Sequence, residues 1–446
     1  MNGKSVLMCC YYFPPFARSG GMRSLQFGKR LVERGWDVEI LTADPSLYTS
    51  TVDPASTAKG YESMPWAKVT HVGLPPELRG GAHSRRREFL ATLRDPWRLE
   101  GEMMRNWCDA VTEVAQKKLQ QRPDTVLYIG MQPYAAGLVG LRLQESLGTK
   151  WVADLADPWT LDEVCAYSSV LHFRRQQKIF RRVLQKADSV IANTPESARA
   201  MIEFEPSARE RTSIVTYGYD TANVPNERPA PPRDSKEFVL VHLGAIEVTG
   251  AASQRSNPLR YRPYSTDVSA RGTFYLLNAL DLLRERRPDV FTKLRLRIVS
   301  SRTENEFAAV SSRGMAAQFE WTGMLANAKA LAEVARGHAA LLLQQGAPAG
   351  HRLHTVRAKV YEYMAVARPV LACVPEGDGA DFLKRFGRSL QVDPSDAEAI
   401  ANGIVRLHDE YDSFANAPVD RPFVESFEWG ALTARLDEAM TRLIAR

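Results

Sequence analysis

The stretch RAKVYEYMAVARPVLA, residues 357–372, decides the fold of this chain. Its apolar residues recur at helical spacing up to Arg368, and Pro369 then stops the helix and begins an apolar strand. Lys359 and Glu362 stand in the helix where most of their neighbours are apolar. The stretch therefore predicts a helix that runs straight into a buried strand and carries two candidate functional side chains.

A second segment, near the N-terminus, complements the first. An apolar strand over 5–12 breaks at Pro14 and Pro15, and the chain then passes Gly20 and Gly21 and opens a helix. A Gly-rich turn at a helix N-terminus suits an anion, because backbone N–H groups and the helix dipole point at it. Together the two segments predict two Rossmann-like halves that close on one phosphorylated ligand.

Strand–helix alternation runs through almost the whole sequence, which is typical of parallel sheets with helices on both faces. A chain of 446 residues is too long for one core and suits two domains of roughly 200 residues each. Four prolines between residues 223 and 236 indicate a linker. We expect an α/β protein with an N-terminal domain over 1–222, a linker over 223–236, a C-terminal domain over 237–427 and a final helix within 428–446.

Composition and charge restrict the class of protein. The hydrophobic fraction of 44% and the charged fraction of 25% are ordinary for a soluble globular protein. We expect no membrane span and no export, because no run of about 18 apolar residues and no signal-peptide pattern occurs. The formal net charge of +6 suits anionic partners such as nucleotide sugars or lipids. No nucleic-acid motif accompanies this charge, so we expect no nucleic-acid partner.

The five cysteines show no paired spacing that suits a metal site or a disulfide framework. Cys9, Cys10 and Cys373 fall in predicted buried strands, where a free thiol acts as a small hydrophobe. Reduced thiols fit a cytoplasmic protein, which is the location we expect.

Five short blocks carry a family resemblance. They are YYFPP at 11–15 with the Gly pair and Arg23 that follow, WVADLADPW at 151–159, ADSVIANT at 187–194, YGYD at 217–220 and the stretch from Lys359 to Ala372. In this order they make the chain resemble a retaining, family 4-type glycosyltransferase of the GT-B fold, the kind that builds bacterial surface polysaccharides. The resemblance implies two Rossmann-like, doubly wound domains facing a central cleft, the first binding the acceptor and the second the nucleotide sugar. It also implies that the final helix packs back across the domain junction.

Sugar transfer from a nucleoside diphosphate builds negative charge on the departing phosphate, so cations or N–H donors are needed there. By resemblance, Arg271 is the basic residue that grips the phosphate, and Lys359 is a second basic donor. Gly20 and Gly21 would bring N–H groups from the first domain. No Asp-x-Asp motif stands at a strand end, and the resemblance implies a reaction that needs no metal and no cofactor. It also implies attack on the face of the departing phosphate, which helps to remove the proton.

Glu362 is the strongest candidate in the donor site. The family helix carries a Glu-x7-Glu pattern, and its second Glu, matched by Glu362, contacts the ribose hydroxyls as a bidentate acceptor. His354 stands in the place of the first Glu, which leaves the sugar contacts and the role of His354 open. Gly346 lies in the loop that is expected over the sugar. The predicted donor-binding residues are Gly20, Gly21, Gly244, Arg271, Gly346, His354, Lys359 and Glu362.

Asp154 and Asp157 lie at the carboxyl end of a predicted strand, the edge where open parallel sheets place ligands. Either carboxylate could orient or deprotonate the acceptor hydroxyl, and we prefer Asp157. We expect Arg23 and Trp159 to bind the acceptor as well. The predicted catalytic residues are Asp154, Asp157, Arg271 and Lys359, and the predicted acceptor-binding residues are Arg23, Asp157 and Trp159.

Two segments have more than one interpretation. Residues 83–107 mix arginines with Trp and Leu, which suits an anionic membrane surface. Four acidic residues dilute that charge, so a solvated helix or an acceptor lid is an equal alternative. A polar insertion over 246–270 is longer than the turn in relatives, and we favour a passive or disordered loop over a site for an acidic acceptor.

Two other functions stay open beside glycosyl transfer. The first is a catalytically silent nucleotide-binding or scaffold protein, which the missing first Glu of the pattern favours slightly. Leu155 and Ala156 favour the same alternative, because relatives have Phe and Arg at these positions. The second is a nucleotide-sugar 2-epimerase of the same fold, which would need further acid–base side chains than the sequence offers. Donor turnover separates a scaffold from both enzymes.

Overall fold

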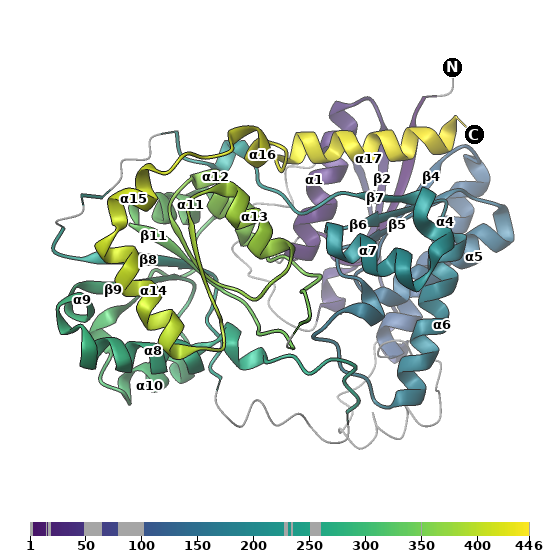
Figure 1. The fold of residues 1–446 in the computed structure, drawn as a ribbon. Coiled ribbons are helices and arrows are strands. Elements are labelled where there is room, and N and C mark those ends of the chain that lie inside the picture. The colour runs from purple at the N-terminus through teal and green to yellow at the C-terminus, as the bar shows by residue number, and fades with distance from the viewer. Residues whose placement is uncertain are drawn as a thin grey trace. The chain divides into compact units, whose positions relative to one another are not determined.

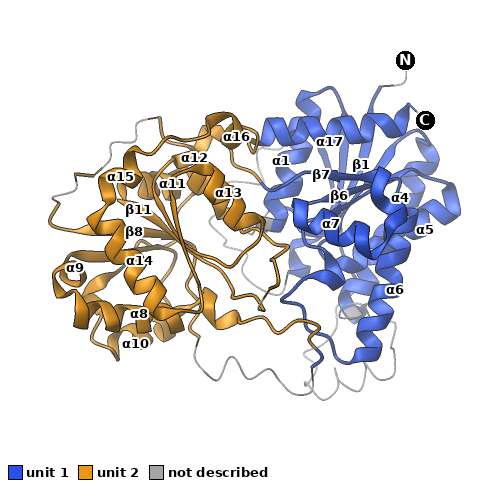
Figure 2. Ribbon diagram, viewed as in Figure 1, with its two compact units in different colours: residues 1–217, 259–261, 429–446 blue, residues 218–258, 262–428 orange. Residues whose placement is uncertain are grey.

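The computed structural model describes residues 3–14, 16, 19–48, 65–78, 102–226, 231–232, 235–249, 260–348 and 350–445. It divides into two compact units, which Figure 2 shows in different colours. Unit 1 comprises residues 1–217, 259–261 and 429–446, and unit 2 comprises residues 218–258 and 262–428. Most of segment 83–107 and parts of the linker and of the polar insertion lie outside the described residues.

Unit 1 is built on a seven-stranded parallel sheet with the order β3-β2-β1-β4-β5-β6-β7. The internal strand β1 is buried along its whole length, as expected for a strand covered on both faces. Val6 on β1 is in register with Val38 on one side and Val126 on the other. The strands are β1 (Ser5–Cys10), β2 (Asp37–Ala43), β3 (Lys68–Val72), β4 (Val126–Gly130), β5 (Trp151–Leu155), β6 (Ser189–Ala192) and β7 (Thr212–Ile214).

Six α-helices are described in unit 1: α1 (Ser19–Glu33), α4 (Glu102–Gln121), α5 (Gly137–Leu147), α6 (Val170–Lys186), α7 (Pro195–Phe204) and α17 (Trp429–Ile444). Short 3-10 turns join them, namely η1 (Pro45–Leu47), η2 (Pro76–Leu78), η3 (Tyr134–Ala136), η4 (Trp159–Leu161) and η5 (Pro206–Arg211).

Helix α17 returns to unit 1 from the far end of the sequence and lies beside α1 (Figure 1). The Phe27 and Trp429 rings meet edge to face at 5.5 Å. Asp437 accepts hydrogen bonds from Lys4 Nζ at 3.0 Å and from Trp36 Nε1 at 2.9 Å. The helix thus covers apolar surface at the start of the chain.

Unit 2 repeats the architecture with a six-stranded parallel sheet of order β10-β9-β8-β11-β12-β13. Its strands are β8 (Phe238–Leu243), β9 (Leu294–Val299), β10 (Phe319–Trp321), β11 (Ala339–Leu343), β12 (Val370–Cys373) and β13 (Ser389–Val392). Its α-helices are α8 (Thr273–Arg286), α9 (Pro288–Lys293), α10 (Glu304–Ser311), α11 (Asn327–Arg336), α12 (Lys359–Val366), α13 (Asp378–Phe386), α14 (Ala397–Asp409), α15 (Tyr411–Asn416) and α16 (Arg421–Glu425). The 3-10 turns are η6 (Thr221–Asn223), η7 (Val268–Arg271) and η8 (Ala316–Gln318).

The decisive stretch has the predicted form. Helix α12 ends at Val366 and is capped by Ala367, whose φ of 61° is left-handed, and β12 begins at Val370. Arg368 between them is buried and donates to the Ala335 carbonyl, which ties α12 to α11. The prediction of two Rossmann-like parallel-sheet domains is confirmed. Among the described residues, no helix has the length and apolar character needed to cross a bilayer.

Candidate functional site

An ion pair occupies the predicted acceptor edge of unit 1. Arg23, from the first turns of α1, donates Nε–H to Asp154 Oδ2 and Nη2–H to Asp154 Oδ1, each at 2.7 Å. It also donates to the carbonyls of Val215 and Thr216 at 2.7 Å. Both side chains are buried, with exposed fractions of 3% and 2%. Arg23 therefore joins α1, β5 and the segment after β7.

The electrostatics of the pair favour the charged form of Arg23. Burial lowers the pKa of Arg23, but the Asp154 carboxylate outweighs burial and the net shift is upward. Burial and Asp154 raise the pKa of Tyr128, whose hydroxyl donates to Asp154. Both Asp154 oxygens thus accept hydrogen bonds inside the protein, as in a structural ion pair. The catalytic role of Asp154 and the acceptor-binding role of Arg23 stay predictions.

Gly20 and Gly21 lie in the first turn of α1, where neighbouring atoms approach closely. A cavity of about 20 Å³, room for about one water, is lined by Gly20, Gln132 and Asp154 among others. A Cβ on Gly20 would lie 2.6 Å from Gln132 Oε1, and a Cβ on Gly21 would lie 2.8 Å from the Phe16 carbonyl oxygen. Steric crowding therefore explains why both positions hold glycine. Their role in phosphate binding stays a prediction.

Asp157 has an acidic neighbour that the sequence analysis missed. Gln132 Nε2 donates to Asp157 at 2.8 Å. Asp162, after η4, accepts from Val164 N at 3.0 Å and from Cys165 Sγ at 3.5 Å. Burial, together with the nearby Asp157 carboxylate, raises the pKa of Asp162. A carboxyl group with a raised pKa can hold a proton and release it, so Asp162 joins Asp157 as an acid–base candidate. The signal in the sequence was the second acid of the run DPWTLD at 157–162.

Trp159 supports this loop from inside the protein. Its φ of 48° is left-handed, which is rare for a bulky residue and marks local strain. Its ring is fully buried, donates Nε1–H to Gln176 at 2.8 Å and stacks on Tyr134 at 5.3 Å. Direct contact between Trp159 and an acceptor stays a prediction, and it requires the buried ring to move.

Lys359 lies at the carboxyl end of β8 in unit 2. Its Nζ donates to the Leu243 carbonyl and lies 3.1 Å from His242 Nε2. His242 Nδ1 is 2.9 Å from the Leu341 carbonyl, a bond that requires the ring proton on Nδ1 and leaves Nε2 as an acceptor. Burial and the nearby Arg357 lower the pKa of Lys359 to about 7. A phosphate beside this Nζ would favour the charged form.

Gly244 and Glu362 complete this corner of unit 2. Gly244 has a left-handed φ of 89°, and a Cβ there would lie 3.7 Å from Lys359 Nζ. Glu362, one turn along α12 from Lys359, accepts from Asn327 Nδ2 at 2.7 Å. Burial raises the pKa of Glu362, and the bond from Asn327 opposes this. Asn327, the first residue of α11, was not identified from the sequence, because only the fold brings it to Glu362.

Arg271 is engaged by an acid of the polar insertion. Its Nη2–H donates to Glu247 Oε2 at 2.9 Å and its Nε–H donates to the same oxygen at 3.2 Å. The adjacent N-terminus of α8 is occupied as well. Thr273 N–H donates to the Glu247 carbonyl at 2.9 Å, and Phe274 N–H donates to Thr249 Oγ1 at 3.1 Å. The described part of the insertion thus contacts Arg271, the residue that the resemblance assigns to a phosphate, and the helix N-terminus beside it.

The loop between β11 and α12 holds Gly346 and His354. Gly346 N–H donates to the Asp267 carbonyl at 2.9 Å, and a Cβ there would lie 2.4 Å from Ser395 Oγ. The His354 ring is buried and lies 5.2 Å from the His351 ring. Neighbouring residues of this loop line a cavity of about 530 Å³ that also borders the ends of β12 and β13. The donor-binding roles of Gly346 and His354 stay predictions.

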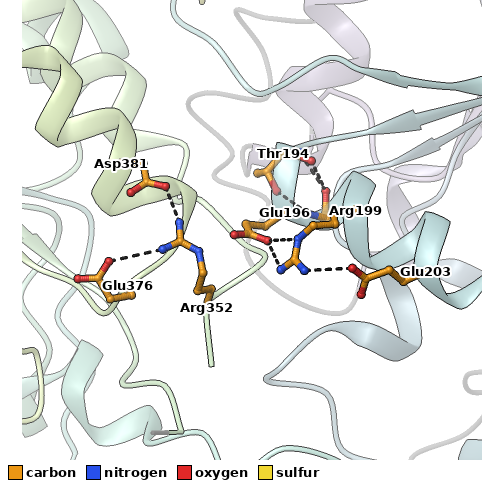
Figure 3. Close-up of polar contacts among 8 residues, drawn as sticks. Thr194, Glu196, Arg199, Glu203, Arg352, Glu376 and Asp381 are labelled. Atoms are coloured by element: carbon orange, nitrogen blue, oxygen red, sulfur yellow. Dashed lines mark hydrogen bonds and ion pairs between the residues drawn. The ribbon is translucent and has the colours of Figure 1, made fainter. Parts of the chain in front are cut away.

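Arg352 lies at the wall of this cavity. It donates to Asp381 and lies 3.6 Å from Glu376, as Figure 3 shows. All three side chains are partly exposed, so these ion pairs contribute little to stability. The two acids thus balance the positive charge of Arg352.

The block ADSVIANT at 187–194 contains β6 and ends at Thr194, the N-cap of α7. Thr194 and Ser197 form a capping box at the N-terminus of this helix. One turn further, Arg199 donates to Glu196 at 2.8 Å and to Glu203 at 3.0 Å, drawn in Figure 3. The capping box gives Thr194, the last residue of the block, a structural role.

Solved structures with the same fold cover nearly the whole chain. Sucrose-phosphate synthase from Thermosynechococcus elongatus has a TM-score of 0.65 and 15% identity, over 99% of this chain and 99% of that one. Anabaena HepE, solved with UDP and glucose, has a TM-score of 0.62 and 14% identity, over 98% and 100%. The lipopolysaccharide outer core galactosyltransferase WaaB has a TM-score of 0.59 and 12% identity, over 98% and 99%. At these identities the likeness shows the fold alone.

Family profiles give the activity class. Residues 20–218 match the glycosyl transferase 4-like domain, and residues 266–410 match the glycosyl transferases group 1. The protein is a glycosyltransferase of the GT-B type. The predicted donor residues Arg271, Lys359 and Glu362 of this glycosyltransferase fall in the group 1 region, and Asp154 and Asp157 fall in the 4-like region. No curated protein sequence matches the chain significantly.

Proposed function

We propose that this glycosyltransferase moves a hexose-type sugar from a nucleoside-diphosphate sugar to a saccharide or lipid-linked acceptor, with retention and without a metal. The observation that carries the proposal is the corner at β8 and α12, where a cation and a carboxylate lie one helical turn apart beside a glycine. These groups suit the two ends of a nucleotide, because Lys359 Nζ can pair with a phosphate and Glu362 can accept ribose hydroxyls. The UDP and glucose bound in the structure of Anabaena HepE support this class of donor.

The chemistry follows from the charges that develop. The bond between the anomeric carbon and the phosphate oxygen breaks, and negative charge builds on the leaving diphosphate. We assign the stabilisation of that charge to Lys359. Arg271 supplies a second cation when the phosphate displaces Glu247 from it. The acceptor oxygen forms its bond to the anomeric carbon on the same face, and its proton goes to the leaving phosphate. Asp157 and Asp162 are the candidates to orient the acceptor hydroxyl.

The pathway and the location belong to this proposal. The galactosyltransferase WaaB acts on lipopolysaccharide outer core by its name, which supports a role for this chain in bacterial surface polysaccharide synthesis of the family 4 type. A lipid-linked acceptor would place the enzyme at the inner face of the cell membrane. The arginine-rich segment 83–107 that would favour such contact lies mostly outside the described residues.

The test is thermal stabilisation by UDP, GDP, dTDP and ADP, with Glu362→Ala beside the wild type. A nucleotide at a hundredfold excess over its Kd adds about 2.7 kcal/mol to the unfolding free energy, which gives a visible shift. Glu320→Ala is the matched control, because Glu320 is an exposed acid of unit 2 paired with Arg297. We expect one nucleotide to stabilise the wild type and the control but not Glu362→Ala.

Two outcomes contradict the proposal. If no nucleotide stabilises the wild type, or if Glu362→Ala responds like the control, the nucleotide site is placed wrongly. The scaffold alternative holds if the protein binds the corresponding nucleotide sugar but does not release its sugar in the presence of saccharide and lipid-linked acceptors. Conversion of the bound sugar into its C2 epimer would identify the epimerase alternative.

A further inference from the structure

Helix α6 of unit 1 is strongly basic. The sequence has 58 Lys and Arg against 52 Asp and Glu, a formal net charge of +6. The helix, VLHFRRQQKIFRRVLQK, contains six of the basic residues and none of the acidic ones. The other residues of the chain therefore sum to a formal charge of zero, and α6 is a basic element without acids of its own.

The helix presents this charge along one face. Its buried side consists of Gln176, Phe180, Val183 and Leu184, which pack into unit 1. On the opposite side, the exposed residues recur at helical spacing and are Leu171, Arg174, Lys178, Arg181, Arg182, Gln185 and Lys186. From Leu171 to Lys186 this stripe is roughly 22 Å long at 1.5 Å per residue. Figure 1 shows α6 along the edge of unit 1, where it packs against α5.

Acidic side chains pair with only some of the basic residues in this stripe. Arg182 pairs with Glu145, and Arg181 lies 3.9 Å from Glu205. Arg174, Lys178 and Lys186 form no ion pair with any described residue. The stripe therefore keeps a net positive field that an anionic partner can use.

An apolar end distinguishes the kind of partner. Leu171 is 67% exposed and Val170 is 43% exposed, both in the first turn of the helix. Exposed aliphatic side chains next to a basic stripe suit the boundary between lipid headgroups and acyl chains. A nucleic acid would use the cations but would gain nothing from the exposed leucine.

We propose that α6 docks on an anionic membrane surface, with its cations against the lipid headgroups and Leu171 at the acyl boundary. The helix follows directly on the loop of Asp157 and Asp162, so docking would hold that loop of unit 1 near the bilayer. This surface is distinct from segment 83–107, and it does not depend on which nucleotide the enzyme binds.

Vesicle sedimentation of the full-length protein tests the proposal. The probes are vesicles of phosphatidylcholine alone and of equal parts phosphatidylcholine and phosphatidylglycerol. Each cation near an anionic surface is worth roughly fivefold in partition. The double variant Arg174→Glu with Lys178→Glu should therefore lose more than about twentyfold in binding to the anionic vesicles. The control double variant, Lys117→Glu with Arg435→Glu, changes the net charge equally at exposed sites of α4 and α17 and should bind like the wild type.

Three further measurements test the membrane proposal. Raising the ionic strength from about 0.1 M to about 1 M shortens the screening length from about 10 Å to about 3 Å and should release the wild type. Leu171→Asp should weaken binding at low salt. The proposal is overturned if the wild type ignores anionic vesicles, or if the α6 variant binds like its control. It is also overturned if replacing Arg85, Arg86 and Arg87 by Glu abolishes binding that the α6 variant keeps.

Discussion

Glu247 and a donor diphosphate should compete for Arg271. The Arg271–Glu247 pair is 2.9 Å long, and its side chains are 28% and 57% exposed. An exposed pair of this kind is worth about 0.2–1 kcal/mol. The diphosphate has to displace Glu247, so Glu247→Gln should lower the Kd for the nucleoside diphosphate by a factor of about 1.4 to 5. The backbone contact from Thr273 to the Glu247 carbonyl does not depend on the side-chain charge and should persist.

Isothermal titration of the stabilising nucleotide into four proteins measures this competition. They are the wild type, Glu247→Gln, Arg271→Gln and the double variant. The gain from Glu247→Gln should vanish in the Arg271→Gln background, because the cycle isolates the coupling between the two side chains. Glu320→Gln, another exposed acid of unit 2 paired with an arginine, is the control. Weaker binding by Glu247→Gln, or a gain that survives without Arg271, would refute the reasoning.

Three other predictions concern single contacts. The pKa of Lys359 is about 7 in the folded protein, so its cation is lost as pH rises. The Kd for a nucleoside diphosphate should therefore increase from about pH 7 to about pH 9, and Lys359→Met should bind weakly without this pH dependence, as fluorescence titration can show. Asn327→Ala removes the hydrogen bond that orients Glu362 and should raise the Kd for a ribonucleotide roughly tenfold, with little effect on the melting temperature; an unchanged Kd would exclude this role. Asp154→Asn leaves Arg23 buried without its counter-charge and should cost about 3–5 kcal/mol in urea unfolding, whereas a cost below about 1 kcal/mol would contradict a structural pair.

The layers of the fold were predictable because their signals are local. The apolar runs of β1 and β8 and the helix stop at Arg368–Pro369 can each be identified within about ten residues of sequence. Parallel strands buried on both faces need such runs, whichever enzyme they belong to.

The candidate site was predictable only in part, because its contacts join distant segments. Glu362 and Lys359 share one helix and were found together, but Asn327, which orients Glu362, lies 35 residues away. Arg23 and Asp154 are 131 residues apart in the sequence, so their mutual neutralisation could not be seen before the fold. Glu247 stands in an insertion without periodicity, and nothing local marks it as the partner of Arg271.

Because α17 belongs to unit 1, that unit cannot be completed until the end of the chain has been synthesised. A ribosome makes residues 218–428 after unit 1 has emerged and before α17 exists. At about 5–20 residues per second this interval lasts on the order of 10–40 seconds. During that time the surface around Phe27 and Trp36 lacks its cover, so the nascent chain should expose a binding site for chaperones that closes only when Trp429 and Asp437 arrive.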